Sequence, residues 1–312
     1  MDTQLLDEVI DCLSGERYLF RYGSDQYAVV LLQRLLQESD QKISELRKSS
    51  FGRLLNKPVI QKVVARKGDG KINRYDLDRL LADADSPYIL TLDRWGNKKD
   101  YRWSQISRPG ENLVLQMNFN RQHDQDFERL LEIDREEFNG WSHPTCKTGR
   151  STLCWARLDL DFESGQALIE EIQTDWYRDV FRLYRRKEWA ENQQRKQFKF
   201  WGYELSVEKV HAYCARTLEI HRQWNEAMLT AVLKFLWEEL GIHDVYYHSY
   251  ETGRILKNIG IYSGPPRSLY TDLPKRFCFE EVRRGPQWIE NCTPARRRLK
   301  KIKQPKWFRL AI

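Results

Sequence analysis

The chain has 312 residues, of which 41% are hydrophobic and 31% are charged, and its formal net charge is +7. Its 11 Trp, 15 Tyr and 13 Phe residues supply large side chains to bury, which excludes a chain that is disordered throughout. No run of about 18 apolar residues occurs, so a membrane-spanning helix is excluded and we expect no membrane partner. This length suits two domains, or one large domain with an extension.

The first part of the chain carries the apolar spacing of short helices. Apolar residues fall on one helical face in each of Leu5–Leu13, Val29–Leu36 and Leu54–Val64. We therefore expect a helical N-terminal region over residues 1–85, with a domain boundary near residues 82–87.

A short segment in this region, Asp69–Asn73, is similar to the middle of a calcium-binding EF-hand loop. With Gly70 at the sixth position, Ala65 and Lys67 stand at the first and third positions, where carboxylates are required. Asp76 stands at the twelfth position, where a glutamate is usual. Two ligands are missing and one is replaced by a cation, so we expect no metal site here.

From about residue 86 the pattern changes from helical to alternating. Tyr88–Leu92 and Asn112–Phe119 are predicted strands, and Asp124–Glu137 is a predicted charged helix. We expect residues 86–294 to form a mixed domain of strands and helices.

Two further alternating segments, Thr152–Phe162 and Ala167–Thr174, are predicted to form a hairpin. A two-residue turn at Ser164-Gly165 puts Glu171 and Gln173 at the end of the apolar face, with Asp175 next on the same side. The opposite face is then polar and solvated, and it carries Arg157, Asp159, Asp161 and Glu170.

A carboxylate on an apolar face costs several kcal/mol unless it is paired or neutral. Such a cost is tolerated where the group works, for example as a general base with a raised pKa. On this interpretation Glu171 is the base. On the alternative, Glu171 pairs with an internal arginine and Gln173 caps a neighbouring strand. The sequence leaves both interpretations open.

The positive charge is concentrated near the C-terminus. Eight of the 52 basic residues lie in Ala295–Arg309, which holds no acidic residue, and the rest of the chain has a net charge of −1. A basic tail over residues 295–312 is suited to binding nucleic acid or an acidic partner. Alternatively, the tail packs Trp307 and Phe308 back on the body. The candidate contacts are Arg296, Arg297, Arg298, Lys300 and Lys301.

A second basic stretch, Arg182–Lys199, is interleaved with aromatic residues and includes Arg185 and Arg186. That mixture is typical of surfaces that bind single-stranded nucleic acid or RNA loops. Because Glu188 and Glu191 interrupt the stretch, an ordinary surface helix is the favoured alternative.

The stretch Ser142–Val180 contains the block Glu171-Ile172-Gln173-Thr174-Asp175-Trp176 after an alternating strand and an acidic turn. It resembles a segment of the large polyvalent proteins of phages and conjugative elements. The likeness extends more loosely to residues 224–226, 241–245 and 269–274. This resemblance implies a bacterial, phage-related mobile-element or defence setting, and no settled reaction.

The C-terminal half also resembles that of GNAT-type N-acyltransferases, which runs strand, helix, strand, helix, strand. The corresponding segments are Leu168–Thr174, Asn225–Leu240, Val245–Ser249, Glu251–Ile259 and Phe277–Val282. The resemblance implies an acyl-CoA donor, with Glu171 as general base and Tyr250 or Tyr262 protonating the leaving thiolate.

The chain departs from that family at the loop that binds the pyrophosphate of CoA. GNAT proteins use a glycine-rich loop there, whereas His221–Trp224 precedes the predicted helix and holds no glycine. About 50 residues separate the strand from that helix. Either this insertion supplies another anion site or CoA is not bound. The candidate cofactor contacts are Arg222, Gln223, Asn225 and Arg267.

The histidines and cysteines give little further chemistry. No HxH, HExxH or CxxC pattern occurs among the six histidines and six cysteines, so we expect no metal site. His248 is the best placed histidine because it ends a predicted strand. The unpaired cysteines, and a start that lacks the features of a secretory signal, lead us to expect a reducing, cytoplasmic setting.

The sequence therefore predicts an α+β fold with a helical N-terminal region, a mixed GNAT-like sheet flanked by helices, and a basic tail. The predicted function is a GNAT-like acyltransferase that uses acyl-CoA or a similar donor. Its expected catalytic group is Glu171, Gln173, Asp175, Tyr250 and His248. The alternative is a non-catalytic protein that binds nucleic acid or a protein partner. The acceptor and the oligomeric state are left open.

Overall fold

A computed structural model describes residues 1–13, 18–36, 39–81, 86–96, 104–140, 143–147, 149–260 and 266–312. The expected domain boundary falls largely on residues 82–85, which lie outside the described residues. Tyr262, one of the two tyrosines expected to protonate a thiolate, lies outside them too.

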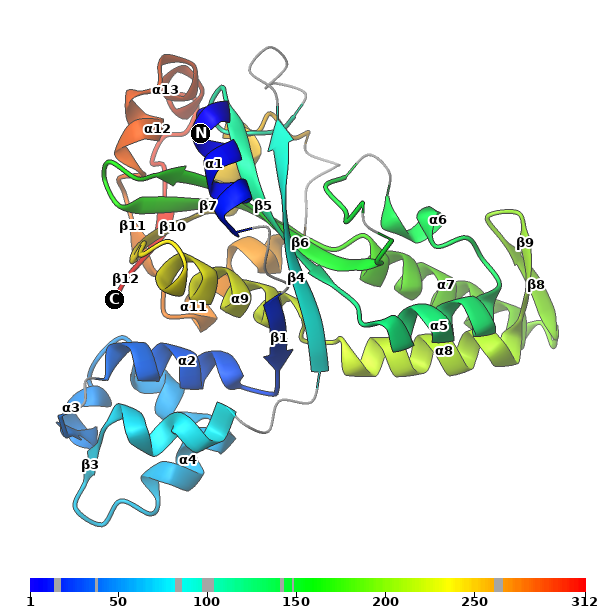
Figure 1. Ribbon diagram of the computed structural model, residues 1–312, viewed down its shortest axis with the longest axis horizontal. Coiled ribbons are helices and arrows are strands. Elements are labelled where there is room, and N and C mark those ends of the chain that lie inside the picture. The colour runs from blue at the N-terminus through cyan, green and yellow to red at the C-terminus, as the bar shows by residue number, and fades with distance from the viewer. Residues whose placement is uncertain are drawn as a thin grey trace.

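An eight-stranded mixed sheet forms the centre of the protein, which confirms the α+β class (Figure 1). Adjacent strands of this sheet are antiparallel, except for the parallel pair β7 and β10. In spatial order the strands are β1 (Tyr18–Tyr22), β4 (Ser86–Gly96), β5 (Glu111–Asn118), β6 (Thr152–Asp161), β7 (Gln166–Gln173), β10 (Asp244–His248), β12 (Trp307–Ala311) and β11 (Glu280–Val282).

The crossover from β7 to β10 is long and builds an arm on one side of the sheet (Figure 1). It consists of α7 (Trp176–Asn192), the hairpin β8–β9 (Gln197–Phe200 and Tyr203–Ser206), α8 (Val207–Ile220) and α9 (Trp224–Glu238). The arm also includes α5 (Arg121–Leu131) and α6 (Glu136–Asn139), whereas α9 packs on β6 and β7. The predicted strands and helices of the C-terminal half are therefore present as β7, α9, β10, α10 (Tyr250–Leu256) and β11.

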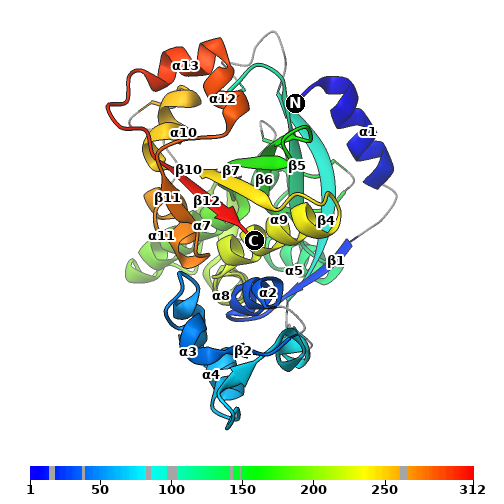
Figure 2. The same ribbon diagram turned by 90° about the vertical axis from the view of Figure 1, so that its left-hand side faces the viewer.

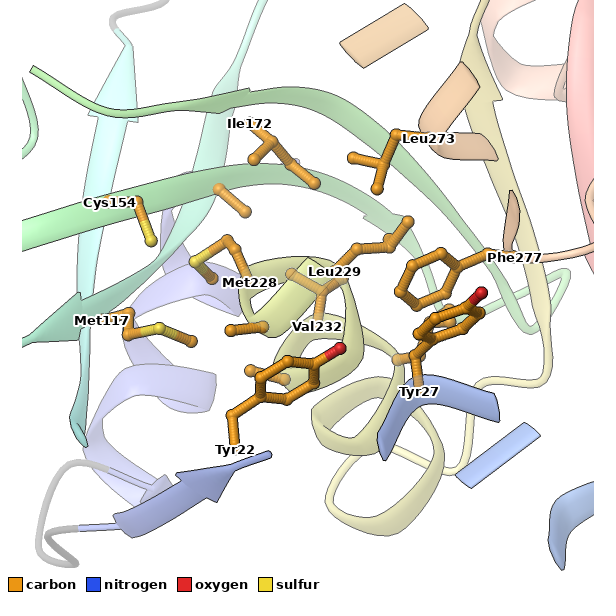
Figure 3. Close-up of a cluster of buried hydrophobic side chains, with 14 of the residues drawn as sticks. Tyr22, Tyr27, Met117, Cys154, Ile172, Met228, Leu229, Val232, Leu273 and Phe277 are labelled. Carbon is orange, nitrogen blue, oxygen red and sulfur yellow. The ribbon is translucent and has the colours of Figure 1, made fainter. Parts of the chain in front are cut away.

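The sheet buries both of its faces. On one face, Met228, Leu229 and Val232 of α9 pack against Cys154 and Ile172 of the sheet (Figure 3). On the other face, a second core cluster includes residues of α10, α12 (Gln287–Asn291) and α13 (Thr293–Leu299). Figure 2 shows these three helices together beside the strands β10 and β12. Because both faces are covered, polar residues on either face lie in the interior.

The N-terminal region is mostly helical, as expected, but it is not helical throughout. Its strand β1 pairs with β4 and so belongs to the main sheet. The other elements are α1 (Thr3–Leu13), α2 (Gln26–Leu35), β2 (Gln41–Lys42), α3 (Ile43–Leu46), the 3-10 helix η1 (Gly52–Asn56), α4 (Pro58–Val64), β3 (Lys71–Ile72) and the 3-10 helix η2 (Arg74–Leu81). In the loop that is similar to an EF-hand, the Lys67 ammonium forms an ion pair with Asp76.

The basic C-terminal segment is folded rather than free. It contains α13 and β12, and β12 pairs with β10 on one side and β11 on the other. Trp307 is fully buried, and its indole ring packs so closely on Gly285 that a Cβ added there would overlap the ring. The interpretation that Trp307 and Phe308 pack back on the body is therefore correct. The remaining elements before β11 are η3 (Arg267–Tyr270) and α11 (Asp272–Arg276). Among the helices in the described parts of the chain, none has the length and apolar character needed to cross a membrane.

The burial of Trp307 predicts that this strand is essential for stability. Trp307→Ala should lower the free energy of unfolding by about 3–5 kcal/mol, because it leaves a cavity beside the second core cluster. Urea unfolding followed by circular dichroism measures this. Lys303→Ala, in the same segment but exposed, should leave the midpoint unchanged. An unchanged midpoint for Trp307→Ala would show that the segment is dispensable.

Candidate active site

The hairpin of β6 and β7 contains a bulge that the sequence pattern did not predict. Asp161 pairs with Gln166, so the connection has four residues rather than two. Leu158 pairs with Ile169, but Arg157 pairs with Glu171, which leaves Glu170 as an extra residue in β7. The predicted register is therefore wrong.

The bulge changes which carboxylates share a face. Paired residues on neighbouring strands lie on the same face, so Glu171 lies with Arg157, and Glu170 joins them across the bulge. This face was expected to be solvated, but Arg157 is 2% exposed and Asp159 and Glu170 are fully buried. The segment 104–110 covers it. Arg157 donates hydrogen bonds to the carbonyl oxygens of Ser104 and Gln105, at 2.7 and 3.1 Å.

Glu171 is held between two cations. It forms a buried ion pair with Arg157, and the Lys257 Nζ lies 3.5 Å from its carboxylate. Burial alone would raise the pKa of Glu171, but the charges of Lys257 and Arg157 outweigh burial and lower it. The expectation of a raised pKa is therefore wrong, and the alternative of pairing with an internal arginine is correct.

A cleft of about 760 Å³ lies at the end of β7. Within the described residues, β7 pairs with β10 only as far as Ile169 and Tyr247, and beyond them it pairs only with β6. In the part of the chain that the structure describes, one edge of β7 after the bulge therefore has no partner strand. The cleft is lined by Glu171, Gln173 and Thr174 after that point, by Tyr177, Arg178, Phe181 and Arg182 of α7, and by Gln105, His143, Trp224, Ile259, Pro266 and Leu269.

A histidine–aspartate pair forms part of the cleft wall. The His143 Nδ1 lies 2.6 Å from the Asp175 carboxylate, which also accepts hydrogen bonds from Gln173 at 2.9 Å and Arg178 at 2.6 Å. Burial would raise the pKa of Asp175, but the hydrogen bond and charge of His143, with Arg178, lower it. An ionised Asp175 favours the tautomer with the proton on Nδ1, which leaves Nε2 as an acceptor. The His143 side chain is 31% exposed and lines the cleft, so a molecule bound in the cleft can reach it.

Sequence reasoning missed His143. It stands 32 residues before Asp175 and belongs to no metal or nucleophile motif. The one available signal was its place inside the stretch Ser142–Val180 that carries the resemblance to polyvalent proteins.

His248 lies in the closed part of the same buried charge cluster, away from the cleft. It is fully buried, and its Nε2 lies 3.0 Å from both the Glu170 carboxylate and the Ser107 Oγ. Burial lowers the pKa of His248. Burial would raise the pKa of Glu170, but its contacts with His248, Lys257 and Ser107 lower it to about 2. His248 does not line the cleft, whereas Glu171 and Gln173 do.

The other predicted cofactor and catalytic residues are scattered around the cleft rather than gathered in it. Tyr250 is the first residue of α10, and the Arg267 guanidinium lies 4.8 Å from the centre of its ring. Neither residue lines the cleft. Gln223 donates to Ser24, near α2, and the Asn225 side chain accepts from the Glu226 N–H. Arg222 is exposed, and its charge acts on the half-buried Tyr177 of the cleft wall.

The predicted contacts for nucleic acid lie on two separate surfaces. Arg185 and Arg186 are exposed on α7, in the arm. Arg296, Arg297, Lys300 and Lys301 are exposed on and after α13, at the other side of the sheet in Figure 1. Arg298 is half-buried and donates to the carbonyl oxygen of Leu256.

Among the residues that the structure describes, no three histidine, cysteine or carboxylate side chains are grouped so that they would hold a metal ion. No protein-family model, curated protein or solved structure matches the chain. The chemistry of the cleft therefore has to be argued from its own residues.

The buried cluster predicts a specific pH dependence of stability. Glu170 has a pKa of about 2 in the folded protein against an ordinary value of 4.5, so its carboxylate stabilises the fold above pH 4.5 and loses this effect as the pH falls towards 2. At pH 7, Glu170→Gln should therefore be less stable than the wild type by roughly 3 kcal/mol.

Chemical unfolding at a series of pH values measures this difference. The difference should shrink steadily between pH 4.5 and pH 2, where the wild-type carboxylate takes up a proton. Glu163→Gln, which removes an exposed carboxylate from the hairpin connection, is the matched control and should be nearly neutral at pH 7. A difference for Glu170→Gln that does not vary with pH would contradict the assignment.

Proposed function

We propose that this protein is a GNAT-like acyltransferase that takes an acyl group from acyl-CoA or a similar thioester donor and transfers it in the cleft at the end of β7. The observation that carries the proposal is the parallel pair β7–β10, whose pairing ends at Ile169 and Tyr247 beside a cleft of about 760 Å³. The order of strands and helices from β7 to β11 supports the same conclusion.

The edge of β7 that has no partner strand among the described residues suits the extended arm of such a donor. A strand edge offers main-chain N–H and C=O groups, and an extended molecule with amide groups binds to them as an added strand. The edge lies at Glu171–Gln173, between the bulge and the start of α7. The thioester end of the arm would then lie near His143.

The start of α7 supplies the positive charge that a phosphate-bearing donor needs. The first helix after β7 begins at Trp176, two residues after the strand, so the expected gap of about 50 residues applies only to α9. Arg178 and Arg182 of α7 line the cleft. The N-terminus of α7, which is the positive end of the helix dipole, also lies at the cleft. These residues fit an anion without a glycine-rich loop.

His143 replaces Glu171 as the proposed general base. Glu171 is ionised but engaged by Arg157 and Lys257, so it is poorly suited to take up a proton. His143 is oriented by Asp175 and has Nε2 available for the proton of the attacking nucleophile. The bound donor supplies an activated acyl carbon, and the chain supplies position and proton transfer.

A non-catalytic nucleic-acid-binding protein is the second candidate. The exposed arginines of α7 and α13 favour it. It gives no reason for a partly exposed histidine to be oriented by a buried carboxylate at a cleft, and so it ranks second.

If His143 is the general base, its substitution should slow acyl transfer without weakening the binding of the donor. In isothermal titration calorimetry, His143→Gln should bind acetyl-CoA with the affinity of the wild type, because the His143 side chain does not bind the charged groups of the donor. The rate of thiol release in the presence of a pool of amine acceptors should fall by about 10²–10⁴-fold, since the general base is lost.

His243→Gln is the matched control, because His243 is exposed on the surface and bonded to Arg34. It should change neither quantity. Absence of acetyl-CoA binding at millimolar concentration would refute the acyltransferase proposal. Wild-type rates of thiol release in His143→Gln would refute the role of His143.

A further inference from the structure

One face of α7 carries a line of cationic and aromatic side chains that begins in the cleft. Arg178, Arg182, Arg185 and Trp189 are spaced by four, three and four residues, so they follow one side of the helix. Arg178 and Arg182 line the cleft, whereas Arg185 and Trp189 lie beyond it and are exposed. Because α7 runs out along the arm (Figure 1), the line leads away from the proposed reaction centre.

The charge on this line is available to a ligand. Arg178 and Arg182 form ion pairs with Asp175 and Asp179, one turn earlier in the chain. Arg185 and its neighbour Arg186 form no ion pair with any residue in the described parts of the chain. The positive charge therefore increases with distance from the cleft.

Aromatic rings alternate with these cations. Phe181 is 51% exposed at the cleft, and Trp189 is 38% exposed further along α7. The guanidinium of Arg186 lies 4.1 Å, and that of Arg195 5.1 Å, from the centre of the Trp189 ring. Exposed rings beside arginines are the combination on which unpaired bases stack while phosphates bind the charges.

We propose that the acceptor of the acyl group is a single-stranded segment of nucleic acid that lies along this side of α7. We name this surface, with Arg185, Arg186, Phe181 and Trp189, the α7 stripe. Its arginines bind phosphates, its rings stack on bases, and the end of the strand enters the cleft. This inference rests on the proposed acyltransferase function.

The transfer balances as an ordinary acyl exchange. An amino or hydroxyl group of the nucleic acid forms a bond to the acyl carbon, and the bond from that carbon to sulfur breaks. The proton of the nucleophile passes to the Nε2 of His143 and then to the leaving sulfur. The products are an acylated nucleic acid and a free thiol.

Two comparisons favour this acceptor and this surface. An acidic peptide would use the arginines but would leave the exposed rings of Phe181 and Trp189 without a role. The basic segment at α13 shares no residue with the described lining of the cleft, so a strand bound there would not be led to His143.

The test compares two matched pairs of arginines. Arg185→Gln/Arg186→Gln removes two exposed charges from the α7 stripe, and Arg296→Gln/Arg297→Gln removes two from α13. Fluorescence anisotropy with a labelled 20-nucleotide single-stranded RNA of mixed sequence, without any acyl donor, measures the affinity over a range of salt concentrations.

The α7 double variant should bind about tenfold more weakly, and the slope of log affinity against log salt should fall by one to two, as expected for about two lost phosphate contacts. Trp189→Ala should weaken binding by about tenfold and leave the slope unchanged, because stacking is not ionic. The α13 pair should bind within twofold of the wild type.

An equal or larger loss in the α13 pair would overturn the proposal, as would an α7 variant that binds like the wild type. Binding of polyglutamate but not RNA would assign the stripe to an acidic protein instead. Because no donor is present, failure of acetyl-CoA binding refutes the proposed function without affecting this result. If both ligands bind, radiolabelled acetyl groups should appear on the RNA, and their absence there would overturn the acceptor proposal.

Discussion

A single extra residue in β7 determines the geometry of the candidate site. Glu170 has no pairing partner in β6, and the bulge at this position coincides with the end of pairing between β7 and β10. A bulge bends its strand and interrupts the ladder of hydrogen bonds. Among the described residues, the bent strand has one edge without a partner strand beside the cleft, and it directs two consecutive carboxylates to the same buried face. The cleft and the charge cluster therefore have a common origin.

Two carboxylates on one buried face require cations, and the fold supplies them from distant segments. Arg157 comes from β6, opposite Glu171, and Lys257 follows α10. Lys257 also donates to the carbonyl oxygen of Glu170 and to the hydroxyl of Tyr270, at 3.0 and 3.1 Å. Removing one member of such a cluster leaves a buried charge without its partner, so the cluster fixes the cleft wall rigidly. His143 lies outside this cluster, and the proposed function assigns proton transfer to it.

Local patterns in the sequence predicted the elements but not their register. The strands and helices from β7 to β11 follow from alternation and helical spacing, and the inward position of Glu171 was expected, although on the wrong face. The alternation of apolar and polar residues did not reveal the bulge. A shift of one residue in the pairing of β7 with β6 exchanges the two faces of the strand, but the sequence itself is unchanged. The sequence pattern placed Arg157, Asp159 and Glu170 in solvent. The segment 104–110 that covers them lies far from them in the sequence, so no local pattern predicts the contact. His143 was missed for the same reason, since only the fold brings it to Asp175.

The proposed function requires the donor to bind at the edge of β7 that has no partner strand within the described ranges. Hydrogen–deuterium exchange with and without saturating acetyl-CoA tests it directly, since a bound strand protects the amides it pairs with. The account predicts slower exchange in peptides covering Ile169–Arg178, and unchanged exchange in α13. Bound acetyl-CoA that protects another region and leaves the end of β7 unchanged would contradict it.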